Sequence, residues 1–176
     1  LAQRARGEGV TFIFCESPMQ PAVGATYFWS YVYYISKFYE LLDTVLQLLK
    51  GRRPPFFALH VYHHAVVVFM AWWWIEYRQS LHPIGLCFNS FVHIPMYYFY
   101  YLRARGRDVW WKRYITQLQI VQFAFSLLCL LPTGVLLLQG ATCAGMVPLL
   151  LNLAFNVSLL VQFVGVYSFN AKNKRQ

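Results

Sequence analysis

Three histidines, His60, His63 and His64, lie near the start of an apolar segment that covers residues 56–75. In a helix, His60 lies one turn from both of the others, so the three imidazoles share about a third of the circumference. Ionisable side chains inside an apolar span are costly and usually mark a function. An imidazole can act there as a nucleophile, a general base or a metal ligand. A lone histidine would be interpreted as a core residue, but three at this spacing predict a catalytic site.

A second set of polar side chains lies in the segment 84–102. Four of them follow one another at helical spacings: Asn89, His93, Tyr97 and Tyr100. These spacings place an imidazole, an amide and two phenols on one face of a helix, directed into a helix bundle. Tyr98 and Tyr101 lie off this face and suit an aromatic belt at the membrane interface.

The segment 27–49 carries charges inside an apolar span. Lys37 and Glu40 are three residues apart, which predicts an ion pair along one stripe of the helix. Asp43 lies beside this stripe and is free to hold a histidine of the next helix. Because buried charges need partners, the same residues could instead form a structural ion pair that fixes helix packing.

The segment 114–138 begins with regularly spaced polar residues, Thr116, Gln119 and Gln122. They would present hydrogen-bonding groups to the same interior. Glutamines in membrane helices often only bond to a neighbouring helix, each for about 1 kcal/mol, so a purely structural role is an equal alternative.

The composition points to a membrane. Of 176 residues, 59% are apolar and only 12% are charged, against about 25% charged in soluble domains. The formal charge of +9 suits membrane orientation or an anionic ligand, and without any nucleic-acid-binding motif we expect no nucleic-acid partner. The four cysteines show no CxxC spacing, so neither a zinc site nor a disulfide scaffold is expected: Cys15, Cys87, Cys129 and Cys143.

Helical spans organise the chain. Five segments are long enough to cross a bilayer, which takes about 20 residues of helix: 27–49, 56–75, 84–102, 114–138 and 144–169. Basic residues concentrate after the first and third segments and in the tail, whereas Arg78 alone follows the second and none follows the fourth. The positive-inside rule then places the C-terminus in the cytosol and the start of the chain on the opposite side. The predicted fold is an all-α polytopic membrane bundle.

The motifs together resemble those of a known family, the ELO-type fatty acid elongases. The four signatures stand in the family's order and spacing: Lys37-x-x-Glu40-x-x-Asp43-Thr44, His60-x-x-His63-His64, Asn89-x-x-x-His93-x-x-Met96-Tyr97-x-x-Tyr100-Tyr101 and Thr116-x-x-Gln119-x-x-Gln122-Phe123. A single HxxHH is a weak signal, but four motifs in sequence make the resemblance specific.

The resemblance implies a location and an architecture. Family members have seven membrane helices around a substrate tunnel, so residues 1–176 are expected to be an elongase membrane domain with the last five spans, lacking an N-terminal part. Lys172-x-Lys174 near the end is similar to a dilysine retrieval signal. We therefore expect a multi-pass protein of the endoplasmic reticulum membrane with a cytosolic C-terminus.

The resemblance also implies the condensing step of fatty acid elongation. An acyl-CoA and malonyl-CoA would give a 3-oxoacyl-CoA, CO2 and CoA through a decarboxylative Claisen condensation. His63 is the predicted acyl-carrying nucleophile, since burial favours the neutral imidazole. His93 would act as a base or stabilise the enolate, while His60 and His64 would orient the nucleophile or bind the thioester oxygen. Asp43 or Glu40 would fix a tautomer. No metal and no cofactor are expected.

Substrate contacts are expected at both the site and its mouth. The predicted binding residues are Lys37, Glu40, Asp43, Asn89, Tyr97, Tyr100, Gln119 and Gln122. Four basic residues suit the CoA phosphates, although they could serve topology alone: Arg52, Arg53, Arg105 and Lys112. Without a GxGxxG motif the reductive steps must lie elsewhere. Expected partners are therefore a 3-oxoacyl-CoA reductase, a dehydratase, an enoyl reductase and membrane lipid, and a homodimer is also allowed.

Two other classes of protein remain open. HxxHH also occurs in metal-dependent membrane desaturases and hydroxylases, but these take about eight histidines, and this chain has 5; His82 is expected in a loop. Three or four histidines could still hold one zinc ion. A non-enzymatic lipid receptor or transporter is the second alternative.

The sequence also bears on the acyl chain. The HVYHH sequence resembles elongase family members that handle polyunsaturated or very long chains. The bulky residues Trp72 to Trp74 are expected to cap the tunnel.

Overall fold

The computed structural model describes residues 10–51 and 56–173, and this part of the chain is helical without any strand. Its helices are α2 (Thr11–Phe14), α3 (Ala25–Leu49), α4 (Phe57–Glu76), α5 (His82–Ala104), α6 (Lys112–Leu128), α7 (Leu130–Leu138) and α8 (Met146–Asn173). The long helices match the five predicted segments to within a few residues at each end. The all-α fold class is therefore confirmed.

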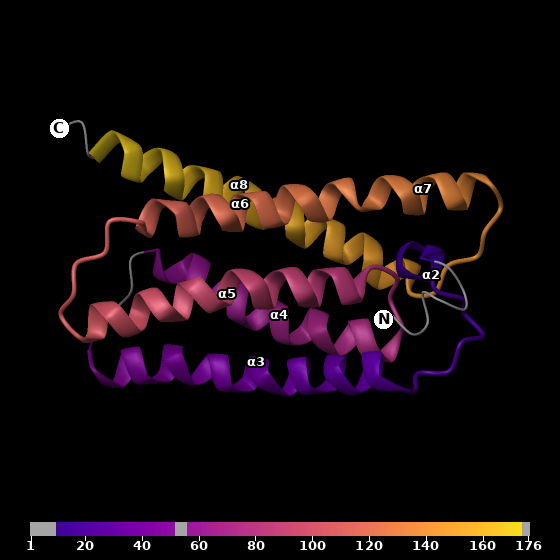
Figure 1. The fold of residues 1–176 in the computed structure, drawn as a ribbon, viewed down its shortest axis with the longest axis horizontal. Coiled ribbons are helices and arrows are strands. Elements are labelled where there is room, and N and C mark those ends of the chain that lie inside the picture. Colours follow the sequence, from indigo (N-terminus) through magenta and orange to yellow (C-terminus); the bar gives the residue numbers. More distant parts are fainter. Residues whose placement is uncertain (1–9, 52–55, 174–176) are drawn as a thin grey trace.

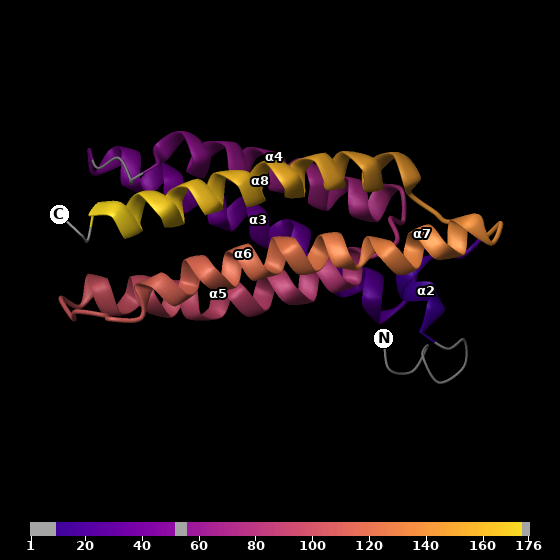
Figure 2. The same ribbon diagram turned by 90° about the horizontal axis from the view of Figure 1, so that it is seen from above.

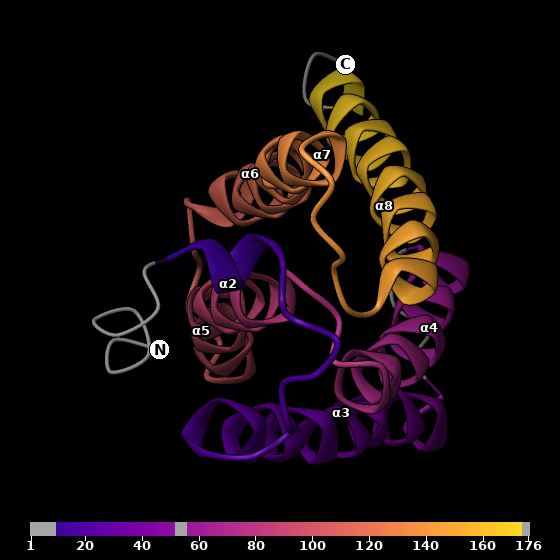
Figure 3. The same ribbon diagram turned by 90° about the vertical axis from the view of Figure 1, so that its right-hand side faces the viewer.

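The long helices form a ring. Seen end-on, the order around it is α3, α4, α8, α6 and α5 (Figure 3), and the contacts between helices follow the same order. Neighbours in the ring run antiparallel, except α3 and α5, which run in the same direction and touch each other least (Figure 1). This arrangement brings side chains from distant segments towards one interior.

The two ends of the bundle differ (Figures 1 and 2). The end of α3, the start of α4, the α5–α6 connection and the end of α8 lie at one end, and α2 with the α4–α5 and α7–α8 connections lies at the other. We call the first the basic end, because the basic loops follow α3 and α5, and the second the α2 end. This segregation agrees with the alternation predicted from charge.

Among residues 10–51 and 56–173, three helical stretches are long and apolar enough to cross a membrane: α4, the α6–α7 rod Lys112–Leu138, and Met146–Ala171 of α8. Helices α3 and α5 are similar in length, at 25 and 23 residues, but they carry the charged and polar motifs. The structure thus supports a multi-pass membrane protein, while membrane crossing by α3 and α5 stays a prediction. Many large apolar side chains of these helices are exposed, which suits contact with lipid.

The predicted fourth span is interrupted. Cys129 separates α6 from α7, and Pro132 lies one turn further on. Proline has no N–H, and its ring crowds the carbonyl of the residue four positions earlier, which here is Leu128, the last residue of α6. Prolines are tolerated in this way in membrane helices.

The α2 end is closed by a cap built from residues 10–24 and the two connections beside them. Backbone bonds join its parts: Leu81 N donates to Ile13 O at 2.9 Å, and Ala144 N donates to Glu16 O at 2.7 Å. The Thr133 hydroxyl of α7 donates to Phe14 O at 2.7 Å. These bonds fix where α4 ends and α5 begins, and thereby the register of the two histidine-bearing helices.

A disulfide links this cap covalently. Cys15 and Cys143, 128 residues apart in sequence, form a disulfide bond. The cysteine spacing had indicated no disulfide scaffold, and it missed this bond because the fold brings together two loops that spacing alone cannot relate.

His82 does not lie in a loop, as the sequence had suggested, but begins helix α5. Pro83 follows it, and the fixed φ of proline suits the first turn of a helix. His82 is buried, with its Nδ1–H donating to Gln79 O at 2.7 Å and its Nε2 lying 3.1 Å from Ser30 Oγ. This histidine is thus a bonded part of the cap rather than a member of the predicted site.

Candidate active site

Helices α4 and α5 bring together the four histidines that the sequence singled out. Ring centroids of His60 and His64 lie 4.4 Å apart, those of His63 and His64 5.3 Å apart, and those of His63 and His93 6.5 Å apart. His63 thus lies at the centre, in contact with one ring of its own helix and one of the next. The predicted convergence of imidazoles from two helices is present.

His63 and His64 have free ring nitrogens. Within the described part of the chain, no hydrogen bond engages either ring. The ring of His63 instead stacks on Phe155 of α8, with 6.5 Å between centroids and an interplanar angle of 24°. An imidazole held by an aromatic ring, with its lone pair unused, is available as a nucleophile or as a ligand.

His60 is anchored to α3. Its Nε2 lies 2.9 Å from the hydroxyl of Thr44. The sequence had suggested Asp43 as the partner of a histidine from the next helix, but the partner of this ring, among the described residues, is the side chain one position further on. Adjacent helical residues point about 100° apart, so the rotation of α3 decides which of them faces α4.

A hydrogen-bonded network joins α3 to α5. Lys37, only 2% exposed, donates to Glu40 Oε1 at 2.6 Å, so the predicted ion pair is present. The same ammonium donates to Asn89 Oδ1 at 3.0 Å and lies 4.2 Å from the ring centroid of Tyr33. Tyr33 donates its hydroxyl proton to the same oxygen of Asn89 at 2.8 Å.

His93 lies at the end of this network. Its Nε2 is 3.4 Å from Asn89 Nδ2, and its Nδ1 is 3.7 Å from Glu40 Oε2. Both His93 Nδ1 and Glu40 Oε2 are buried without a hydrogen-bond partner. The separation of 3.7 Å is longer than a hydrogen bond, although a shift of less than about 1 Å would close one.

The remaining predicted residues line the same side of the ring. Tyr97 lies beside His93, with centroids 5.7 Å apart, and Tyr100 follows at 6.2 Å from Tyr97. Gln119 of α6 donates to the sulfur of Met96 at 3.9 Å, and Gln122 is buried one turn further along. The first three helical motifs therefore meet around His93, and the α6 motif adjoins them through Met96.

The predicted CoA-binding residues lie apart from this network. Arg105 and Lys112, at the basic end on the α5–α6 connection, are exposed. In that connection Arg103 and Asp108 form an ion pair at 2.6 Å. Arg52 and Arg53 lie outside the described residues. The geometry leaves Arg105 and Lys112 accessible to a phosphate group without assigning one.

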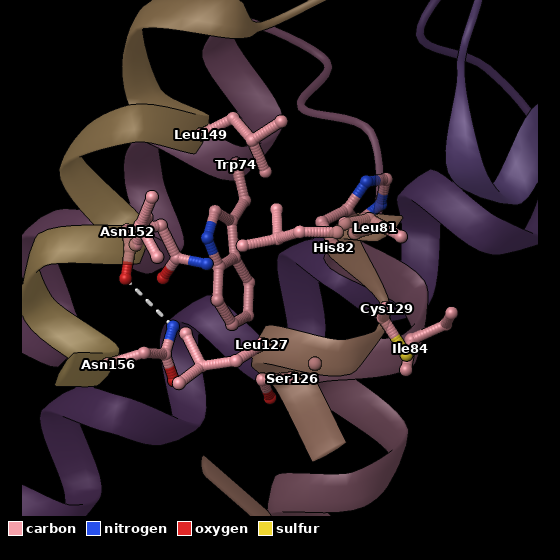
Figure 4. Close-up of a pocket in the computed structure, with 13 residues that line it drawn as sticks. Trp74, Leu81, His82, Ile84, Ser126, Leu127, Cys129, Leu149, Asn152 and Asn156 are labelled. Atoms are coloured by element: carbon pink, nitrogen blue, oxygen red, sulfur yellow. Dashed lines mark hydrogen bonds between the residues drawn. The ribbon is translucent and has the colours of Figure 1, made fainter. Parts of the chain in front are cut away.

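A pocket extends between α4, α5, α6, α7 and α8 near the α2 end (Figure 4). Apolar side chains such as Leu149 share its wall with the polar residues Ser126, Asn152 and Asn156. Trp74 reaches into this pocket, and its Nε1 is buried without a hydrogen-bond partner (Figure 4). The far end of the interior therefore has a mixed polar and apolar lining.

The three tryptophans of α4 have different environments. Trp74 lines the pocket, Trp73 packs against the core cluster of Met70 and Phe123, and Trp72 is 40% exposed. Trp74 is the one of these three tryptophans that lines the pocket, so its side chain is the one that could limit the length of the pocket.

Sequence reasoning missed several residues of this region: Tyr33, Ser126, Asn152, Phe155 and Asn156. The α8 residues carry no motif, and Tyr33 is one of 13 tyrosines. A usable signal for Tyr33 was its spacing, because it lies four residues before Lys37 and so on the same stripe of α3.

Within residues 10–51 and 56–173, no three His, Cys, Asp or Glu side chains are arranged as a metal site. The histidine cluster brings together imidazoles without hydrogen-bond partners among the described residues, a histidine beside a carboxylate, and hydrogen-bond donors, which are groups that can serve as nucleophile, base and charge stabiliser. Aromatic and apolar side chains surround these groups and would hold a hydrocarbon chain.

The chain combines a helical membrane fold with a cluster of four histidines, and comparison with known proteins adds a family. The chain matches the family described as ELO: GNS1/SUR4 over residues 1–176. The protein therefore belongs to the ELO family of fatty acid elongases. No solved structure matches the chain.

Named relatives agree with this assignment. A Dictyostelium discoideum protein provisionally named a fatty acid elongase is 40% identical over 96% of this chain and 55% of its own length. Fatty acid elongase sre1 of the same organism is 42% identical over 66% of the chain and 43% of its own length. The rat very long chain fatty acid elongase 2 is 39% identical over 68% and 48%. The chain thus spans about half the length of the curated relatives it matches.

Proposed function

We propose that this protein catalyses the condensing step of fatty acid elongation, as a 3-oxoacyl-CoA synthase that joins a long-chain acyl-CoA to malonyl-CoA. The observation that carries the proposal is the position of His63. Its ring nitrogens are unengaged, and it lies between His64 of its own helix and His93 of the next. Family membership makes fatty acid elongation the setting of this chemistry.

The first half-reaction transfers the acyl group to His63. The lone pair of the neutral imidazole attacks the thioester carbon, the carbon–sulfur bond breaks, and CoA leaves as a thiolate that takes a proton from solvent. The acyl-imidazolium that remains carries one positive charge. His60 and His64 flank the attacking ring and orient it.

The second half-reaction makes the carbon–carbon bond. Malonyl-CoA loses CO2, and the electron pair of the broken bond forms an enolate, which attacks the acyl carbon. The acyl–nitrogen bond then breaks and returns His63 as a neutral imidazole. The amide N–H groups of Asn89 can donate to the enolate oxygen. His93 can stabilise the enolate charge once its Nε2 has taken the proton of the acyl-imidazolium, and this proton returns to His63 as the acyl–nitrogen bond breaks. The products are 3-oxoacyl-CoA, CO2 and CoA, so no redox cofactor takes part.

The substrates would enter from the basic end. Arg105 and Lys112, with Arg52 and Arg53, suit the phosphates of CoA, while the acyl chain extends through the ring towards Trp74. The disulfide at the α2 end supports a lumenal position for that end and hence a cytosolic C-terminus, as the dilysine-like tail suggests for the endoplasmic reticulum. Reductases and a dehydratase acting on the 3-oxo product are the expected partners.

The test is a product assay on the full-length protein in lipid nanodiscs. Long-chain acyl-CoA and labelled malonyl-CoA should yield labelled 3-oxoacyl-CoA without any reductant. Absence of a labelled product from folded protein would favour a lipid receptor or transporter.

A metal analysis separates the histidine-box alternative. We expect product formation to survive chelation, since the proposed steps use only side chains. Stoichiometric metal, with activity lost on its removal and restored on its return, would instead establish a metal-dependent enzyme.

A further inference from the structure

We propose that Tyr33 is a positioning residue which, together with Lys37 and through Asn89, holds His93 in the neutral tautomer with its proton on Nδ1, directed at Glu40. Tyr33 belongs to none of the four sequence motifs. The proposal rests on the proposed function for its catalytic meaning, but its geometry stands on hydrogen bonds between described residues.

The first step is the orientation of the Asn89 amide. Its Oδ1 accepts two hydrogen bonds, from the Tyr33 hydroxyl at 2.8 Å and from Lys37 Nζ at 3.0 Å. Lysine ammonium groups only donate, and an amide oxygen has two lone pairs. Both lone pairs are therefore used, and the atom of Asn89 that faces the other way is the NH2 group. Tyr33 is itself held in place, stacked on Trp74 at 5.9 Å with an interplanar angle of 11°.

The second step is the protonation state of His93. Asn89 Nδ2 lies 3.4 Å from His93 Nε2. Because an amide NH2 group can only donate, this ring nitrogen must accept and therefore carries no proton. A neutral imidazole then has its proton on Nδ1.

The third step is the partner of that proton. His93 Nδ1 is buried and faces Glu40 Oε2 at 3.7 Å, while the other oxygen of Glu40 accepts from Lys37 at 2.6 Å. The carboxylate is thus fixed by Lys37 and presents its remaining oxygen to the ring. A carboxylate beside a histidine N–H holds the tautomer and stabilises the imidazolium formed when the opposite nitrogen takes up a proton.

The network therefore sets one role for each nitrogen of His93. Nε2 keeps a lone pair and is the basic atom, and Nδ1–H points to Glu40. His63, whose ring centroid lies 6.5 Å away, makes no such bonds to any residue in the described part of the chain. This difference suits His63 to carry the acyl group and His93 to take up and return a proton at Nε2.

The test measures the tautomer directly. Full-length protein with 15N-labelled histidine, in nanodiscs, is compared by NMR with a His93→Gln variant to assign the His93 signals. We expect a neutral ring protonated at Nδ1. In Tyr33→Phe, one of the two donors is lost, the amide can turn over, and the Nδ1–H population should fall. In Asn89→Asp, the carboxylate cannot donate, so the proton should move to Nε2.

Matched controls separate this role from a general structural one. Tyr31→Phe, at an exposed tyrosine on the same helix, should leave the His93 signals and the kinetics unchanged. Tyr33→Phe should lower kcat by up to about tenfold and leave KM unchanged, because the loss of one hydrogen bond corresponds to a rate change of about that size. If Tyr33→Phe does not fold, Asn89→Asp supplies the same spectroscopic test.

Three results would each overturn the proposal: a wild-type His93 protonated at Nε2, an Nδ1–H population that a folded Tyr33→Phe variant leaves unchanged, or one that Asn89→Asp leaves unchanged. The NMR readout requires no turnover. A correct tautomer in a protein that makes no 3-oxo product would therefore count against the proposed function alone.

Discussion

Two histidines at different depths of the same bundle show how burial can serve structure or chemistry. In the cap at the α2 end, His82 has a hydrogen-bond partner at each ring nitrogen, Gln79 O and Ser30 Oγ. In the histidine cluster, neither nitrogen of His63 is engaged among the described residues. Buried polar groups are normally hydrogen-bonded, so those that are not require another explanation.

The rest of the two regions follows the same contrast. The cap is held by a disulfide and by bonds between backbone groups and side chains of distant segments, such as Ser80 Oγ with Glu16 N at 2.9 Å. The cluster leaves His93 Nδ1 and Glu40 Oε2 buried and unpaired. Gln79 is the exception in the cap, since its amide is also buried without a partner. Most polar groups of the cap are thus used in bonds that stabilise the fold, whereas the cluster contains unpaired groups that the proposed reaction would use.

The largest contrast is expected between substitutions of the two histidines. His63→Ala should lower kcat at least about a thousandfold, because a covalent nucleophile has no substitute, and should leave the thermal midpoint near that of the wild type. His82→Ala should lower the midpoint, through the loss of two buried hydrogen bonds worth about 1 kcal/mol each or more, and retain activity in the folded fraction. Product assays and fluorescence-detected melting measure both. An equal loss of kcat in His63→Ala and His82→Ala would contradict the distinction between a catalytic and a structural histidine.

The next effect tests the tightness of the cap. Gly145 has φ +68°, and a Cβ there would lie 2.4 Å from Gln79 Cα and 2.9 Å from Tyr77 O. Gly145→Ala should destabilise the protein by about 3 kcal/mol or more, because neither the left-handed conformation nor the backbone neighbours can yield cheaply. Gly134→Ala is the control, since a Cβ meets nothing within 4 Å there. An unchanged melting midpoint in Gly145→Ala would mean that Gly145 is not tightly packed against the backbone of Tyr77 and Gln79.

A smaller loss is expected on breaking the disulfide. Cys143→Ser should cost about 2–4 kcal/mol, the usual value for a bond that closes a long loop. Cys87→Ser, at an exposed free cysteine on α5, is the matched control. Thermal melting with and without reductant checks the effect. A stabilising role would be contradicted if wild-type protein, unfolded and refolded in the presence of reductant, melted at the same temperature as protein treated without reductant.

The smallest effect concerns the far end of the interior. Trp74→Ala should enlarge the pocket and shift the product distribution longer, by about one elongation cycle, with little change in total turnover. Trp72→Ala, on the exposed side of α4, should not change the distribution. Products are resolved by mass spectrometry across acyl-CoA lengths. A shift in the Trp72 variant alone would move the chain-length limit out of this pocket.

Much of the helical arrangement was predictable from the sequence. Apolar length and loop charge located the long helices and sorted their connections to two ends. The i, i+3 and i, i+4 spacings correctly predicted that His60, His63 and His64 share a face and that Lys37 pairs with Glu40. Local periodicity carries such contacts because they lie within one helix.

Contacts between helices were less predictable. The choice of Thr44 rather than Asp43 by His60 depends on the rotation of α3 in the bundle, which the spacing within α3 does not determine. The spacing of Tyr33 from Lys37 indicates only that the two lie on one stripe of α3, whereas its bond to Asn89, 56 residues away, depends on how α3 packs against α5. The Cys15–Cys143 disulfide joins loops 128 residues apart, and cysteine spacing indicates no pairing at that range.

The most direct test of the proposed mechanism is capture of the acyl-enzyme. Full-length protein in nanodiscs would be incubated with acyl-CoA in the absence of malonyl-CoA, quenched, and mapped by peptide mass spectrometry. We predict one acyl group on the imidazole of His63, discharged as 3-oxoacyl-CoA when malonyl-CoA is added. Turnover with no acylated histidine, or an acyl group that remains on another residue, would contradict it.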